Sequence, residues 1–114
     1  MSRSMELQFN LTSACNAQVL QMTVPADHKY ELLEIEWFAT NPGVNSATAY
    51  RRLPGPFDRL IEWQNPPAFA RQGRMIWPGL VLYAGEGLVT NMTQINPATT
   101  YQLTIMYIDV DYTA

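Results

Sequence analysis

The sequence is poor in the residues that build metal centres and covalent cross-links. Its 114 residues include one cysteine, Cys15, and one histidine, His28. A single cysteine cannot form an intrachain disulfide, and the Cys–His spacing of a zinc site is absent. A metal centre built on a β-barrel normally uses two or three histidines. We therefore expect no bound metal and no other cofactor.

Charged side chains are also scarce. They make up 15% of the chain, against a usual share of about 25%. The formal net charge is −3, and Lys29 is the single lysine beside six arginines. This balance argues against a general nucleic-acid binder. Apolar residues reach 47%, which indicates either a large core or a surface that another molecule covers.

Long hydrophobic runs are missing as well. No stretch approaches the ~18 consecutive apolar residues of a membrane-spanning helix. Residues 1–9 lack the apolar centre of a signal peptide. We expect a protein that is made in a cytoplasm, has no membrane partner and is not secreted through a signal peptide.

What the sequence does have is apolar residues with a period of two, as in half-buried strands. The alternation is clearest over residues 7–11, 20–24 and 33–39. The apolar face of the second run would consist of Leu20, Met22 and Val24. That of the third would consist of Leu33, Ile35, Trp37 and Ala39, opposite Glu34, Glu36 and Phe38.

Further extended segments follow, separated by turn residues. They span residues 46–53, 57–63, 75–77, 80–83, 88–92 and 100–112, with a proline-containing loop at 65–74. No convincing helix, repeat or linker interrupts them. We predict one all-β domain over residues 1–114, a jelly-roll-like antiparallel β-sandwich of about eight strands. Residues 1–5 would be either part of a strand or a flexible N-terminal arm.

The last predicted strand is apolar on both faces. One face carries Leu103, Ile105 and Tyr107, and the other carries Met106, Ile108, Val110 and Tyr112. Such a pattern means that both faces are covered, or that a bulge exchanges them midway. The second set is therefore a candidate subunit contact.

Gly85-Glu86-Gly87 follows an apolar run and invites comparison with a phosphate-binding loop. A dinucleotide loop needs a third glycine that opens a helix, and a P-loop needs Gly-Lys-Ser or Gly-Lys-Thr. Here the chain continues in strand-like alternation, and Glu86 would repel a phosphate. We predict a tight turn in which glycine supplies a positive φ.

Catalytic chemistry has few candidates. Asp109 and Asp111 share one strand face and could hold a hard cation, but charges at a strand end also discourage edge pairing. Cys15 and His28 would make a nucleophile pair without an orienting third residue, so a buried structural cysteine is favoured. We predict no catalytic residues and no enzyme.

Arginines and aromatic residues gather between residues 50 and 74, beside four prolines. Both residue types are enriched at protein interfaces, and rigid loops lower the entropic cost of binding. The candidate contact residues are Arg51, Arg52, Phe57, Arg59, Trp63, Phe69, Arg71 and Arg74. The alternatives are an ordinary loop with scattered cations, a nucleic-acid patch, or an aromatic platform for sugars.

Two stretches carry a resemblance to a known group: "YELLEIEWFATNP…SATAYRRL" and "WPGLVLYAGEGLV…YQLTIMYIDV". Over most of residues 28–112 the chain resembles the small jelly-roll proteins found on tailed-phage particles. The shared features are the asparagine turn, the Pro-Gly-apolar-Ala-Gly-acid-Gly-Leu corner and the long last strand. The resemblance implies trimers that decorate or cement a capsid, or that form fibre tips. The middle loops and the last strand would then be the assembly surfaces.

These observations predict a non-enzymatic structural protein of a virion. It would form homo-oligomers, with a trimer favoured, and bind the major capsid protein or another virion protein without nucleic acid. The alternative is a receptor- or glycan-binding module of a phage fibre or tail, which needs an exposed ring among Trp37, Trp63 and Trp77. A small β-barrel enzyme is disfavoured because no catalytic constellation is present.

Overall fold

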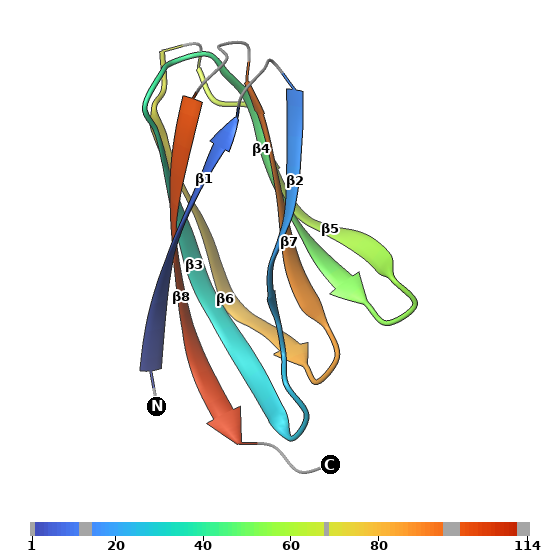
Figure 1. The fold of residues 1–114 in the computed structure, drawn as a ribbon. Coiled ribbons are helices and arrows are strands. Elements are labelled where there is room, and N and C mark those ends of the chain that lie inside the picture. Colours follow the sequence, from blue (N-terminus) through green and yellow to red (C-terminus); the bar gives the residue numbers. More distant parts are fainter. Residues whose placement is uncertain (1, 12–14, 68, 95–98, 112–114) are drawn as a thin grey trace.

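The computed structural model describes residues 2–11, 15–67, 69–94 and 99–111, with side-chain surroundings from residue 18 onward except at Pro78. Every regular element in this part of the chain is a strand (Figure 1). The strands are β1 (Ser2–Leu11), β2 (Cys15–Thr23), β3 (His28–Ala39), β4 (Val44–Leu53), β5 (Phe57–Gln64), β6 (Gln72–Tyr83), β7 (Gly87–Gln94) and β8 (Thr99–Asp111). Among these residues, none forms a helix that is long and apolar enough to cross a membrane.

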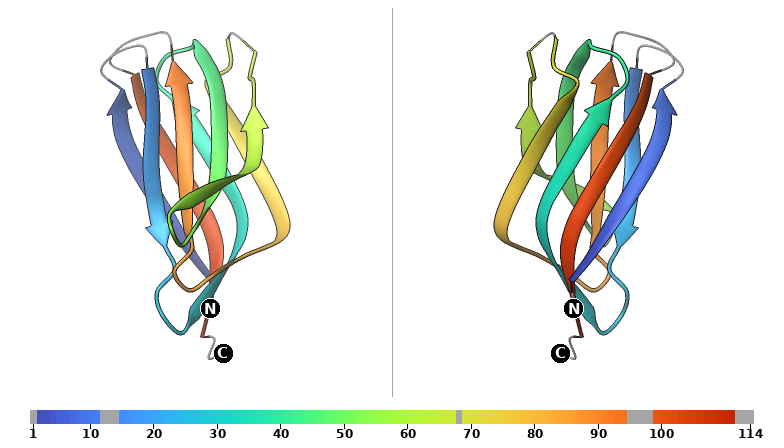
Figure 2. Two further views of the ribbon diagram at one scale, coloured as in Figure 1. Left: turned by 90° about the vertical axis from the view of Figure 1, so that its right-hand side faces the viewer. Right: turned by 90° about the vertical axis from the view of Figure 1, so that its left-hand side faces the viewer.

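The strands form two antiparallel four-stranded sheets that face each other (Figure 2). Sheet A has the order β1-β8-β3-β6, and sheet B has the order β2-β7-β4-β5. The chain thus pairs its first strand with its last, its second with its seventh, and so on inward to β4 and β5. This is a long hairpin of strands folded over on itself, the topology of a jelly roll. The predicted fold class is confirmed.

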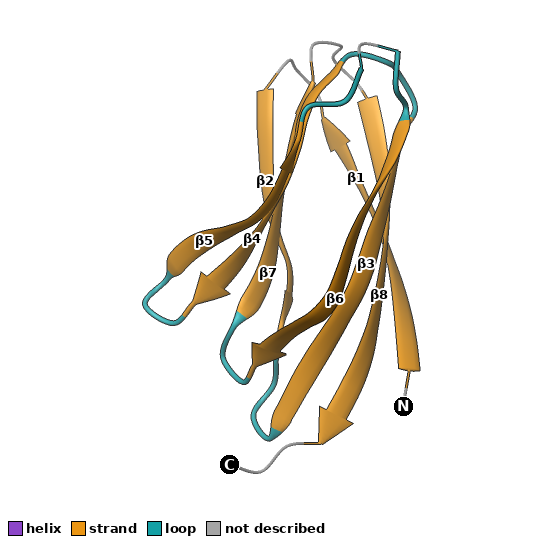
Figure 3. Ribbon diagram, turned by 180° about the vertical axis from the view of Figure 1, so that it is seen from behind, coloured by secondary structure: helices purple, strands orange, loops and turns teal. Residues whose placement is uncertain are grey.

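The core lies between the two sheets, which Figure 3 shows from behind. Alternating side chains of both inner faces fill it, as expected for sheet-on-sheet packing. The largest fully buried apolar residues are Tyr101, Leu32, Ile35, Leu82, Leu88, Met92, Leu103 and Ile105. Of the two apolar faces of the last strand, which the sequence did not rank, the one formed by Leu103, Ile105 and Tyr107 is buried. The alternation of apolar and polar residues along the strands therefore specifies most of the interior.

A bulge in β3 changes which side chains face the core. The register of β3 with both neighbours shifts between Leu32 and Glu34, so Leu33 is an extra residue. Before the bulge Leu32 is buried, and after it Ile35 is buried, while Leu33 is 37% exposed. The prediction that Leu33 shares the buried face was therefore wrong, because one inserted residue reverses the alternation.

A second bulge has the same effect in β2. Its pairing with β7 shifts between Leu20 and Met22. Met22 and Val24 are buried, whereas Leu20 is 46% exposed. The sequence wrongly placed Leu20 with them. The bulge moves its side chain to the outer face of sheet B.

β6 is longer and more continuous than expected. Residues 72–74, predicted as loop, belong to this strand, and the two short runs around Pro78-Gly79 are parts of it. Ile76 pairs with Glu34 and Leu80 with Leu32, so Pro78 lies where the ladder is already interrupted. A proline in an irregularity of an edge strand costs no ladder hydrogen bond.

The turn between β6 and β7 confirms the interpretation of Gly85-Glu86-Gly87. Gly85 has φ 84°. The Glu86 N–H donates to the Tyr83 carbonyl over 2.9 Å. The Glu86 carboxylate accepts a hydrogen bond from the Tyr83 N–H over 2.8 Å. In turn, Gly85 donates to the Val24 carbonyl, which ties this turn to the end of β2.

β1 runs along β8 over its whole length, from Ser2 opposite Ile108 to Leu11 opposite Thr99. Residues 2–5, which the sequence left open between strand and arm, belong to this pairing. β8 therefore lies inside sheet A, between β1 and β3. Its contribution to any contact would come from its outer face and not from a free edge.

Replacing Gly85 by alanine tests the turn. A Cβ at this position would meet Pro54 at 3.8 Å, an ordinary contact, so the cost comes from the positive φ. We expect a loss of about 1–2 kcal/mol in the free energy of unfolding, measured by urea denaturation. Gly85→Asn is the matched control and should lose less, because asparagine tolerates this conformation. Equal losses in both variants would contradict the account.

Candidate functional site

The groups that could do chemistry do not assemble into a centre in the described chain. Cys15 begins β2 and His28 begins β3, at opposite ends of the sandwich (Figure 1). His28 Nδ1 lies 2.7 Å from Asp109 Oδ1 and 3.7 Å from Asp111 Oδ1. Within the described residues, no group of three or more His, Cys, Asp or Glu side chains could hold a metal ion. The two aspartates instead bind the histidine at the end of sheet A.

Tyr101 is a buried titratable residue whose pKa is shifted by its surroundings. Burial raises its pKa to about 12, and a hydrogen bond from Gln94 acts in the opposite direction. The Gln94 amide donates to the Tyr101 hydroxyl over 3.1 Å. The phenol is therefore neutral at physiological pH and serves to satisfy a buried polar pair.

Two of the predicted interface arginines, both on β4, make hydrogen bonds and ion pairs within the chain. Arg51 donates to the Val81 carbonyl of the opposite sheet, and its Nε lies 3.9 Å from Glu86 Oε1. Arg52 Nε lies 2.7 Å from Asp58 Oδ1 across the β4–β5 hairpin. The hydrogen bond from Arg52 lowers the pKa of the Asp58 carboxyl. These guanidinium groups have partners within the chain.

Two further arginines are engaged in the same way. Arg71 donates to the Thr40 carbonyl over 2.9 Å, and Arg74 donates to Glu34 over 2.7 Å. Arg59 is different. It is exposed on β5, and the described part of the chain shows no ion pair or hydrogen bond for its side chain. Of the five predicted cations, it is the one left available to a partner.

The edge strand β5 exposes three large apolar side chains. Phe57 is 66% exposed, Leu60 62% and Trp63 58%. Leu60 and Trp63 pair with Tyr50 and Thr48 on the outer face of sheet B, whereas Phe57 and Arg59 pair with Leu53 and Arg51 and face the other side of the strand. Because β5 is an edge strand, we call these four residues together the β5 surface. A hollow of about 310 Å³ beside it is lined by Arg51, Arg59, Leu60, Ile61 and Leu80. The sequence singled out three members of the β5 surface but missed Leu60.

The apolar character continues across sheet B in one cross-strand row. Leu60 pairs with Tyr50, Tyr50 with Val89, and Val89 with Leu20. Val89 is fully buried although it lies on the outer face, because the row covers it. The ends of the row, Leu20 and Leu60, are exposed at the two edges of the sheet. The sequence did not predict this row, because a strict alternation along β2 places the Leu20 side chain in the core.

The other candidate contacts lie elsewhere. Phe69 is 89% exposed in the loop between β5 and β6. Met106 is 38% exposed, and Ile108 and Val110 are half-buried on the outer face of sheet A. Tyr112 lies outside the described residues. The candidate residues therefore form several separate surfaces instead of one.

The tryptophans divide into two buried rings and one exposed ring. Trp37 donates from Nε1 to Gln64 over 3.3 Å, and Trp77 donates to Glu62 over 3.1 Å. Both indoles lie between the sheets and are buried. Trp63 is the exposed member of the three and meets the requirement that the glycan hypothesis set.

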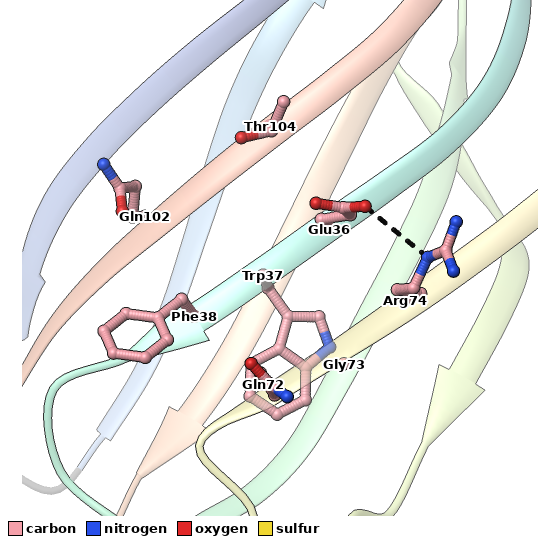
Figure 4. Close-up of a pocket in the computed structure, with 8 residues that line it drawn as sticks. All are labelled: Glu36, Trp37, Phe38, Gln72, Gly73, Arg74, Gln102 and Thr104. Carbon is pink, nitrogen blue, oxygen red and sulfur yellow. Dashed lines mark ion pairs between the residues drawn. The ribbon is translucent and has the colours of Figure 1, made fainter.

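The outer face of sheet A carries a depression of about 580 Å³ (Figure 4). We call it the sheet A depression. It is lined by Glu36, Trp37, Phe38, Gln72, Gly73, Arg74, Gln102 and Thr104. The sequence singled out Arg74 as a contact residue and Trp37 as a candidate sugar platform, but none of the other lining residues. The available signal was Phe38, an aromatic residue on the polar face of its strand.

Comparison of the sequence with protein-family models found no matching family, and a search of curated proteins found no significant relative.

The His28–Asp109 contact gives a pH-dependent stability. The hydrogen bond to Asp109 raises the pKa of the His28 imidazole above 6.5, and burial opposes it. A pKa raised by folding stabilises the folded state fully below pH 6.5, and this contribution is lost as the pH rises through the raised value. We expect the urea midpoint to fall over this range, and to fall less in His28→Gln. An identical pH profile in both proteins would contradict the assignment.

Proposed function

We propose that the protein is a non-enzymatic structural subunit that self-associates and binds the shell of a virus particle as a cement or decoration protein. The observation that carries the proposal is the β5 surface. Three large apolar side chains, each more than half exposed, stand on an edge strand together with Arg59. Exposed apolar edges are sites of association between chains.

The energetics favour covering this surface. Full burial of one large apolar side chain contributes roughly 1.5–3 kcal/mol. Trp63 and Arg59 belong to the residue types that contribute most binding energy at interfaces. Truncation of such residues commonly weakens an interface by more than tenfold. A second copy of the chain would supply the partner surface without any other component.

The position of the apolar row supports a ring of subunits. Leu60 stands at the β5 edge of sheet B, and Leu20 stands at the β2 edge. A contact between the β5 edge of one copy and the β2 edge of the next is heterologous. Such contacts close into rings when the rotation allows it. A trimer is the smallest ring of this kind.

Support for a place on a virus particle comes from the resemblance of residues 28–112 to the small jelly-roll proteins of tailed phages. The exposed Phe69 and the apolar outer face of β8 are separate from the β5 surface and remain available to a shell protein. Several weak contacts made by one oligomer would add through avidity.

Self-association can be tested with Trp63→Ser and Leu60→Ser. We expect the wild-type protein to sediment as an oligomer, and each variant to dissociate at concentrations at least about tenfold higher than the wild type. Ile76→Ser is the matched control, because Ile76 is 59% exposed on the other sheet. Its sedimentation should match the wild type. A wild-type monomer at high concentration would overturn the self-association.

The place on a particle needs its own test. We expect the protein to be found by mass spectrometry in virus particles purified from cells that make it. Particles that lack it should release their genome at a lower temperature, because a cement subunit covers joints between shell proteins. Absence of the protein from purified particles would contradict this part of the proposal.

A second candidate function is the recognition of a glycan or receptor by a fibre or tail module. Trp63 is exposed, but the first function would bury it. The sheet A depression is on the opposite sheet and combines an aromatic ring with polar side chains. It is the better place for a small polar ligand.

A further inference from the structure

We propose that the sheet A depression binds a neutral saccharide, with Phe38 as the stacking ring and the amides of Gln72 and Gln102 as hydrogen-bonding groups. This inference deepens the second candidate function and does not depend on self-association. The two proposals use opposite sheets, so they can fail independently.

The register of sheet A sets the arrangement of these side chains. Phe38 pairs with Gln72 on one side and with Gln102 on the other. The neighbouring row places Glu36 between Arg74 and Thr104, and Figure 4 shows both rows around the depression. An aromatic ring thus stands between two amides, next to a second polar row. The volume of about 580 Å³ falls within the usual range for small-molecule sites.

The floor of the depression is rigid. All its residues lie on β3, β6 and β8, which are neighbouring strands of one sheet. Beneath them the Trp37 indole lies against Gly73, where a Cβ would approach the ring to 2.5 Å. Trp37 is 2% exposed and is held by its hydrogen bond to Gln64. Side chains on packed strands keep a binding geometry better than side chains on loops.

The cation in the lining of the depression, Arg74, is engaged by two carboxylates. Arg74 makes two hydrogen bonds to Glu34, of 2.7 and 3.0 Å, and its Nε lies 3.5 Å from Glu36. No unpaired cation therefore lines the described depression, which disfavours phosphate, sulfate or carboxylate ligands. An amide both donates and accepts hydrogen bonds, as does a hydroxyl such as that of Thr104. This combination matches a ligand that carries many hydroxyl groups.

Phe38 supplies the apolar part of the recognition. Its side chain is 43% exposed beside the polar groups. A sugar ring has an apolar C–H face and a polar rim, so it can cover an aromatic ring while its hydroxyls reach the amides. A peptide is less well matched. Peptides that add to a sheet pair with the backbone of a free strand edge, whereas Phe38 and Gln102 stand on the face of β3 and β8, which are paired on both sides.

The test is a titration followed by two-dimensional ¹H–¹⁵N NMR. The probes are glucose, galactose, mannose, N-acetylglucosamine and disaccharides made from them, at millimolar concentrations. We expect at least one probe to shift the backbone amides of residues 36–38, 72–74 and 102–104. The buried Trp37 indole N–H should report the same event, because it lies under the floor.

Two variants make the assignment specific. Phe38→Ala should weaken binding by about tenfold or more, as truncation of a central contact residue does. Gln72→Ala should weaken it as well, and both variants should keep the dispersed spectrum of a folded protein because their side chains are on the surface. Ile76→Ala is the matched control, an exposed apolar residue of the same sheet that does not line the depression, and should bind as the wild type does.

Three results would overturn the proposal. The first is a panel in which no sugar shifts these three segments. The second is binding that Phe38→Ala and Ile76→Ala reduce equally. The third is a set of shifts centred on Trp63, which would place the sugar on sheet B. None of these results bears on the sedimentation of the oligomer.

Discussion

The outer surfaces of this protein depend on two bulges, one in β2 and one in β3. In β3, the extra residue Leu33 reverses the alternation, so that Trp37 stays inside while Glu36 and Phe38 face out. Without it, the carboxylate of Glu36 would point into the core, where an unpaired charge is costly. In β2, the second bulge places the Leu20 side chain on the outer face of sheet B. The orientation of Phe38 in the sheet A depression follows from the first insertion, and the exposed Leu20 end of the apolar row follows from the second.

The two sheets present different chemistry to the surroundings. The outer face of sheet B carries an apolar row that ends in exposed side chains at both edges. Around the depression, the outer face of sheet A carries amides and a compensated pair of charges, Arg74 with Glu34. One sandwich could therefore bury the edges of sheet B against other copies while the outer face of sheet A stays open to a soluble ligand. That separation lets an assembly role and a binding role coexist in a small domain.

The sequence predicted the fold class and most of the core, because alternation and turn residues are local signals. It did not predict the bulges, since an inserted residue leaves no mark in composition. It also grouped arginines that prove to have separate partners. Arg51 and Arg52 are neighbours in the chain, yet one reaches the opposite sheet and the other pairs across its hairpin. Such contacts depend on long-range register, which a single sequence does not reveal.

The most direct test of the central claim is side-chain accessibility as a function of protein concentration, measured by hydroxyl-radical footprinting. If the β5 edge of sheet B is what a second copy covers, Phe57, Leu60 and Trp63 become protected as the concentration rises. Phe38 and Ile76, which are comparably exposed on sheet A, keep their reactivity. Equal reactivity of both groups at every concentration would contradict the account.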